Sequence, residues 1–258
     1  MLKKKDRKYK MLKYDTITIR GYKLHRIKAL QSFGDVEAGS LGGYIQAEDN
    51  LSHTGNCWVY NKAKVSGLAK VRDDAKICDY AEVYDSAVVS GDTRVCDNAR
   101  IHDSAEVYGN AEVYNNANIC GTAEVYGSSV VAGNAIVHGN AKVRGRVRVY
   151  DFASVFGNAR ILDDAVVCGN ANLTCNAHIE SAFDYCTISG FGSEARTTTF
   201  YKCDDGKIRV ICGCFDGTLK EFKKQVKETH GDNQYAKEYL AIAKIVKKKL
   251  KTEQKEEE

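Results

Sequence analysis

Residues 101–113 read IHDSAEVYGNAEV, and this stretch decides the fold. An alanine recurs every six residues, at Ala105 and Ala111, and an aliphatic residue follows two positions later, at Val107 and Val113. The same register runs from Ala63 to Ala182 without an insertion, as twenty consecutive hexads, with Thr93, Ser129 and Val147 in place of the alanine. Self-similarity that is sustained at a fixed period indicates a repeat architecture.

Each hexad combines a short strand with a turn. The small residue and the aliphatic residue are two positions apart, so both side chains point to the same face of a strand. Turn formers follow, such as Gly109-Asn110 and Gly133-Asn134, which tolerate positive φ. A helix does not fit a period of six. The pattern therefore predicts an all-β solenoid of parallel strands, in which each buried Val or Ile contributes about 1.5–3 kcal/mol.

Two hexads carry a resemblance to a known fold family. Ile101–Glu106 and Ile119–Glu124 resemble the hexapeptide repeat of left-handed parallel β-helix proteins. The resemblance implies a triangular prism with three hexads per coil. Twenty hexads then form six to seven coils, about 30 Å tall at the usual strand spacing.

The whole chain is also similar to hexapeptide-repeat proteins of phages and prophages of Gram-positive bacteria. The segments that carry this resemblance are 33–36 (FGDV), 41–45 (LGGYI), 55–60 (GNCWVY) and 229–233 (THGDN). The resemblance implies a phage-type origin but supplies no reaction.

The pattern divides the chain into three parts. Residues 1–62 are expected to hold a basic, solvated tail up to Lys13, a short β-hairpin cap over Thr16–Leu30 and a first irregular coil. Residues 63–182 form the β-helix. Residues 183–258 are expected to contain a β-hairpin that turns at Asp204-Asp205-Gly206 and two helices. The first helix begins at the capping box of Thr218 and Glu221, and the Lys- and Glu-rich end of the chain is expected to be disordered.

Composition limits the remaining possibilities. The chain has no proline, ten cysteines and a net charge of +4. No apolar run reaches membrane-spanning length and no secretory signal pattern follows the basic start, so we expect a cytoplasmic protein with reduced thiols and no membrane partner. The basic start is better explained as a solvated tail than as a nucleic-acid contact, so nucleic acid is not an expected partner.

Residues eighteen apart should stack on one face, which places Cys120 between His102 and His138. Hexapeptide acyltransferases use a surface His as general base at a subunit interface, so the resemblance implies acyl-CoA chemistry at His102 or His138. The repeat has no loop excursion to cover a substrate, and the sequence fixes no acid beside either His. The two His lie too far apart to share a metal, and the spacing of Cys203, Cys212 and Cys214 is not that of a zinc ribbon. We therefore predict no metal site.

Outward-facing aromatic and arginine side chains suggest a recognition surface. The candidates are Tyr108, Tyr126, Arg144, Tyr84, Arg100 and Tyr114. The main hypothesis is a non-enzymatic phage-type protein that needs no cofactor, forms a homo-oligomer, with a trimer as the first expectation, and binds a host protein in the host cytoplasm, for example a component of antiviral defence. The first alternative is the acyltransferase with acyl-CoA. The second is a binder of a small nucleotide between subunits, although the chain has no Gly-rich phosphate loop.

Overall fold

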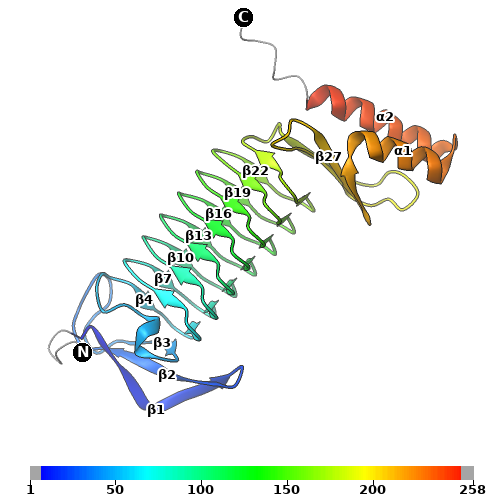
Figure 1. The fold of residues 1–258 in the computed structure, drawn as a ribbon. Coiled ribbons are helices and arrows are strands. Elements are labelled where there is room, and N and C mark those ends of the chain that lie inside the picture. The colour runs from blue at the N-terminus through cyan, green and yellow to red at the C-terminus, as the bar shows by residue number, and fades with distance from the viewer. Residues whose placement is uncertain (1–6, 251–258) are drawn as a thin grey trace, which may run out of the picture.

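The structure of the chain is a computed structural model that describes residues 7–250. It is a straight rod of stacked coils (Figure 1). An N-terminal β-hairpin lies at one end of the rod, and a small antiparallel sheet with two helices lies at the other.

The coils build three parallel sheets, and each regular coil gives one two-residue strand to each sheet. Sheet 1 contains β3 (Leu41–Ile45), β5 (Lys64–Val65), β8 (Glu82–Val83), β11 (Arg100–Ile101), β14 (Asn118–Ile119), β17 (Ile136–Val137), β20 (Ser154–Val155) and β23 (Asn172–Leu173). Sheet 2 contains β4 (Trp58–Val59), β7 (Lys76–Ile77), β10 (Arg94–Val95), β13 (Glu112–Val113), β16 (Val130–Val131), β19 (Arg148–Val149) and β22 (Val166–Val167). Sheet 3 contains β6 (Lys70–Val71), β9 (Val88–Val89), β12 (Glu106–Val107), β15 (Glu124–Val125), β18 (Lys142–Val143), β21 (Arg160–Ile161) and β24 (His178–Ile179).

Strand partners are eighteen residues apart, as in Val107 and Val125. The predicted parallel β-solenoid with three hexads per coil is therefore confirmed. The rod has about eight turns rather than six to seven, since residues 41–62 add an irregular coil with β3, β4 and the short helix η2 (Glu48–Asn50).

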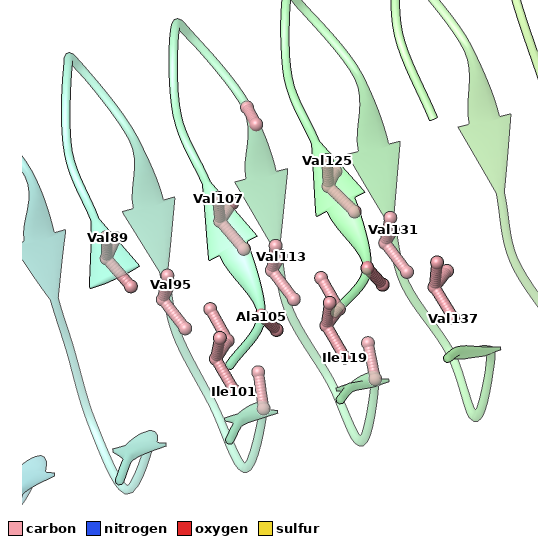
Figure 2. Packing of buried hydrophobic residues seen from close by; sticks show 14 of the residues in the cluster. Val89, Val95, Ile101, Ala105, Val107, Val113, Ile119, Val125, Val131 and Val137 are labelled. Atoms are coloured by element: carbon pink, nitrogen blue, oxygen red, sulfur yellow. The ribbon is translucent and has the colours of Figure 1, made fainter. Parts of the chain in front are cut away.

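The core is a column of Val and Ile with Ala beside them (Figure 2). Val107, Val113 and Ile119 point into the coil, and all three are fully buried. The corners hold residues with positive φ, such as Asp103 at 57°. The carboxylate of Asp103 accepts the N–H of Gly121 in the next coil at 2.8 Å, so the corner side chains tie successive coils together.

The N-terminal hairpin is longer than predicted. Strand β1 (Tyr9–Ile19) pairs with β2 (Tyr22–Ala29), and β2 pairs with β3 to extend sheet 1. The expectation of a solvated tail up to Lys13 is wrong for this segment. The Tyr9 side chain is fully buried, and the buried Lys8 ammonium donates to the carbonyl oxygens of Gly55 and Cys57 at 3.2 and 2.8 Å. The remaining tail residues, 1–6, lie outside the described part.

The C-terminal sheet contains the four antiparallel strands β25 (Tyr185–Ile188), β26 (Thr198–Lys202), β27 (Ile208–Cys212) and β28 (Phe215–Thr218). The predicted hairpin is confirmed as β26 and β27, with two further strands beside it. Helices α1 (Leu219–His230) and α2 (Gln234–Lys249) follow, and Thr218 and Glu221 form the predicted capping box.

Phe200, Phe222 and Tyr239 pack the C-terminal sheet against the helices. Neither described helix is long and apolar enough to cross a membrane. The expectation of disorder at the chain end falls on 251–258, outside the described residues.

Candidate active site

A cavity of about 820 Å³ lies where the last coil meets the C-terminal sheet. We call it the His178 cavity. Its polar lining residues are His178, Glu180, Ser181, Asp184, Lys202 and Asp204. The first four come from the last coil and the turn after it, and the other two come from the end of β26 and the hairpin turn. The cavity therefore exists only because the sheet folds back onto the rod.

Backbone pairing brings the two parts of the site together. Ala177 forms an antiparallel bridge with Cys203, and the N–H of Asp204 donates to the carbonyl of Asn176 at 3.1 Å. In β24 the side chain of Ile179 is fully buried in the core, so the alternation of the strand turns His178 outward. The hairpin turn thus sets Asp204 beside His178.

Carboxylates bind both nitrogens of the His178 ring. Nδ1 lies 2.5 Å from Oδ1 of Asp204, and Nε2 lies 3.0 Å from Oε1 of Glu180. The hydrogen bond to Glu180 contributes most to a raised pKa of His178, and the bond to Asp204 adds to it, against partial burial that lowers it. A ring with two carboxylate partners is held firmly and favours the imidazolium form.

We expect the stability provided by this site to depend on pH. Because the pKa of His178 is raised in the folded state, its contribution is fully present below about pH 6.5 and is lost as the pH rises through the folded-state value. The difference in Tm between the wild type and His178→Gln should therefore be largest at about pH 5.5 and shrink toward about pH 9. A Tm difference that stays constant across this range would contradict the assignment, and His138→Gln serves as the control.

An ion pair between Lys202 and Asp184 stabilises the turn after β24. The Lys202 ammonium lies 2.6 Å from Oδ1 of Asp184, and Oδ2 of Asp184 accepts the backbone N–H groups of Glu180 and Ser181. Burial raises the pKa of Asp184, but these hydrogen bonds outweigh it and leave the pKa lowered. The ionised Asp184 therefore fixes the backbone that carries Glu180.

The outer face of sheet 3 leads into the cavity. Lys142 pairs with Arg160, and Arg160 with His178, so three basic residues stack in one column along the rod. In the next column, Arg144 lies two coils before Glu180 and follows Tyr108 and Tyr126, whose rings stack with centroids 4.7 Å apart. Three of the six predicted surface residues (Tyr108, Tyr126 and Arg144) thus share the His178 face.

The other predicted residues lie elsewhere. Tyr84, Arg100, His102 and His138 are on the sheet 1 side, and Tyr114 is on the sheet 2 side. The His102 ring stacks on Tyr84 at 4.7 Å, and the His138 ring stacks on Phe156 at 4.9 Å. Neither His lines the His178 cavity.

His102 does have an acidic neighbour, which the sequence did not fix. Its Nδ1 lies 3.3 Å from Oδ1 of Asp103, and its Nε2 lies 3.0 Å from Oδ1 of Asn118. Ligand atoms of His102, Asp103 and Cys120 lie within 4.8 Å of one another, and these three residues are the candidate metal ligands. The corner hydrogen bond from Gly121 already explains the position of Asp103, so the cluster needs no metal to form.

Sequence reasoning missed His178. It occupies the position before the aliphatic residue, whereas the candidate histidines, His102 and His138, occupy the position after it. Its partner Asp204 is twenty-six residues away along the chain. The available signal was a His close to the point where the repeat ends, followed by the Asp-rich hairpin turn.

No family model matches the chain. A segment of 55 residues, 21% of this chain, is 38% identical to part of the uncharacterized acetyltransferase YdcK of Escherichia coli strain K12. The matched segment spans 17% of that protein. The similarity therefore covers a small part of both chains and is to a bacterial protein named as an acetyltransferase.

Proposed function

We propose that this chain is an acyltransferase that uses acyl-CoA, with His178 as its general base. The observation that carries the proposal is the His178–Asp204 pair inside a cavity at the end of a hexapeptide-type solenoid. The short similarity to an acetyltransferase supports it. The proposal keeps the reaction of the acyltransferase alternative but moves the base from His102 or His138 to His178.

The site supplies a base and a group that orients it. With Nδ1–H donated to Asp204, Nε2 of His178 carries the lone pair that takes a proton from the acceptor. In the structure, Glu180 forms a hydrogen bond with Nε2 of His178. The side chain of Glu180 is largely exposed, so an acceptor can displace it from this nitrogen. The acceptor nitrogen or oxygen attacks the thioester carbonyl, the new bond to the acyl carbon forms, and the C–S bond breaks. The CoA thiolate takes up the proton that His178 removed.

Charge indicates where each substrate binds. Lys142, Arg144 and Arg160 lie on the face that leads to His178 and suit the phosphate groups of CoA. Adjacent coils are about 4.8 Å apart, so the column of Arg160 and Lys142 extends roughly 10 Å from His178. Inside the cavity, Glu180 and Asp204 flank the base and favour an amine as the acceptor: they attract its cationic form, which loses a proton before the neutral nitrogen attacks.

Titration of acetyl-CoA tests the binding part of the proposal. We expect Arg160→Glu to raise the Kd of acetyl-CoA about tenfold or more, because it replaces a favourable charge by a repulsive one. Lys70→Glu is the matched control, since Lys70 occupies the Arg160 position of sheet 3 five coils away. Undetectable binding, or equal losses in both variants, would argue against this site. Mass spectrometry of an amine panel then identifies the acylated product.

One observation keeps the interaction hypothesis as the second candidate. The stacked Tyr108 and Tyr126 rings lie on a flat face and suit a protein contact. The phage origin, the host-defence target, the trimer and the cytoplasmic location remain predictions, as does nucleotide binding.

A further inference from the structure

Cys78 and Cys96 lie next to each other on the sheet 2 side. Ile77 pairs with Val95, so Cys78 stacks over Cys96 in the next coil. Both residues are largely buried. The coil spacing of about 4.8 Å falls within the Cα separation that disulfides span.

The two sulfur atoms have different surroundings. The Arg94 guanidinium donates through Nε to Sγ of Cys96 at 3.1 Å. Cys96 also lines a cavity of about 230 Å³, together with Arg94, Glu112 and Tyr114, whereas Cys78 is not among its lining residues. Cys96 is therefore the thiol of the pair that faces this cavity.

The two thiols also differ in their pKa values. The hydrogen bond from Cys78 and that from Arg94 lower the pKa of Cys96 to about 7, against burial that raises it. The same thiol contact, together with burial, raises the pKa of Cys78. Cys96 is therefore the thiol of the pair that ionises more readily, and Cys78 keeps its proton.

A third buried cysteine, Cys57, shows that a neighbouring cation alone does not lower the pKa of a buried thiol. Cys57 lies 3.3 Å from the ammonium of Lys8, yet burial raises its pKa. No disulfide partner stacks on it, since Ala75 occupies the position eighteen residues later. Cys57 therefore serves as the internal reference.

We propose that Cys78 and Cys96 are a redox-active dithiol, in which Cys96 attacks a hydroperoxide and Cys78 resolves the product to a disulfide. The Cys96 thiolate bonds to one peroxide oxygen, the O–O bond breaks, and hydroxide leaves from hydrogen peroxide. The Cys78 sulfur then attacks the Cys96 sulfur, the S–S bond forms, and the S–O bond breaks. The hydroxide released in this second step takes the proton of Cys78 and forms water, and the first hydroxide takes up the proton that Cys96 gave to the solvent on ionising. The thiols lose two electrons, and the peroxide yields two waters.

The disulfide would link the coils of β7 and β10. This modification is independent of acyl transfer, because the pair is on the sheet 2 side and does not line the His178 cavity. It can therefore be tested whatever the reaction at His178.

Peroxide treatment of the full chain, followed by peptide mapping without reductant, tests the proposal. We expect a Cys78–Cys96 cross-link that a thiol reductant reverses, and alkylation of Cys96 at pH 7 roughly tenfold faster than that of Cys57. Cys78→Ser should leave Cys96 as a sulfenic acid that dimedone traps. Arg94→Met should slow the reaction of Cys96, whereas Cys57→Ser should leave the cross-link unchanged. Alkylation of Cys96 no faster than that of Cys57, with no cross-link in the folded wild type, would overturn the proposal.

Discussion

Trp58→Ala is expected to lower the free energy of unfolding of the N-terminal end by about 3–5 kcal/mol. Trp58 is the single tryptophan of the chain and is almost fully buried. Its ring contacts Tyr9 of β1 and Phe33 of the link, the segment 30–40 between β2 and β3, with ring centroids 6.1 and 5.4 Å away. A Cβ on Gly42 would lie 2.7 Å from Cζ2 of Trp58, so this glycine leaves room for the ring. The substitution therefore opens a cavity between the hairpin, the link and the first coil.

The loss of stability in Trp58→Ala should be confined to the N-terminal end of the rod. Each coil of a solenoid contacts only its neighbours, so the effect of Trp58→Ala should fade along the rod. Hydrogen exchange should show faster exchange of the amides of β1 to β3, while β14 and β17 keep their protection. Leu68→Ala removes an aliphatic side chain that is 73% exposed and should change stability by less than about 0.5 kcal/mol. Equal stability of Trp58→Ala and the wild type would show that the cap does not depend on this contact.

The sequence predicted the coils because their determinants are local and repeated. The pair Ala105 and Val107 needs only the neighbouring coils to bury it, and an equivalent pair, in most hexads an alanine and an aliphatic residue, recurs every six residues. The capping box of Thr218 was equally readable, since its partner Glu221 is three residues away. Such short-range patterns predict the local structure without any knowledge of long-range contacts.

The candidate site was not readable for the opposite reason. Asp204 reaches His178 only because the C-terminal sheet folds back and pairs Cys203 with Ala177. The sequence likewise placed Lys8 in a solvated tail, but its ammonium donates to the carbonyl oxygens of Gly55 and Cys57. Contacts between distant segments depend on how the caps dock, and the hexad pattern contains no information about that docking.

His178→Gln is expected to lower kcat/KM for acyl transfer by about 10²- to 10⁴-fold. The glutamine is similar in size but has no basic nitrogen to accept the proton of the acceptor. Binding of acetyl-CoA should persist, because the basic column of sheet 3 is unchanged. In the wild type, kcat/KM should rise with pH through the raised pKa of His178, because only the neutral ring acts as the base.

Two sets of variants separate a base from a merely structural residue. Glu180→Gln removes the largest contribution to the raised pKa of His178, so the rise in kcat/KM should move to lower pH while activity is kept. Asp204→Asn should move the profile in the same direction and also lower the maximal rate, because the ring loses its orienting carboxylate. His102→Gln and His138→Gln should leave kcat/KM unchanged, since both rings lie on the sheet 1 side, away from the cavity. If those two variants abolished turnover while His178→Gln remained active, the base would lie on the sheet 1 side and the assignment of His178 would be wrong.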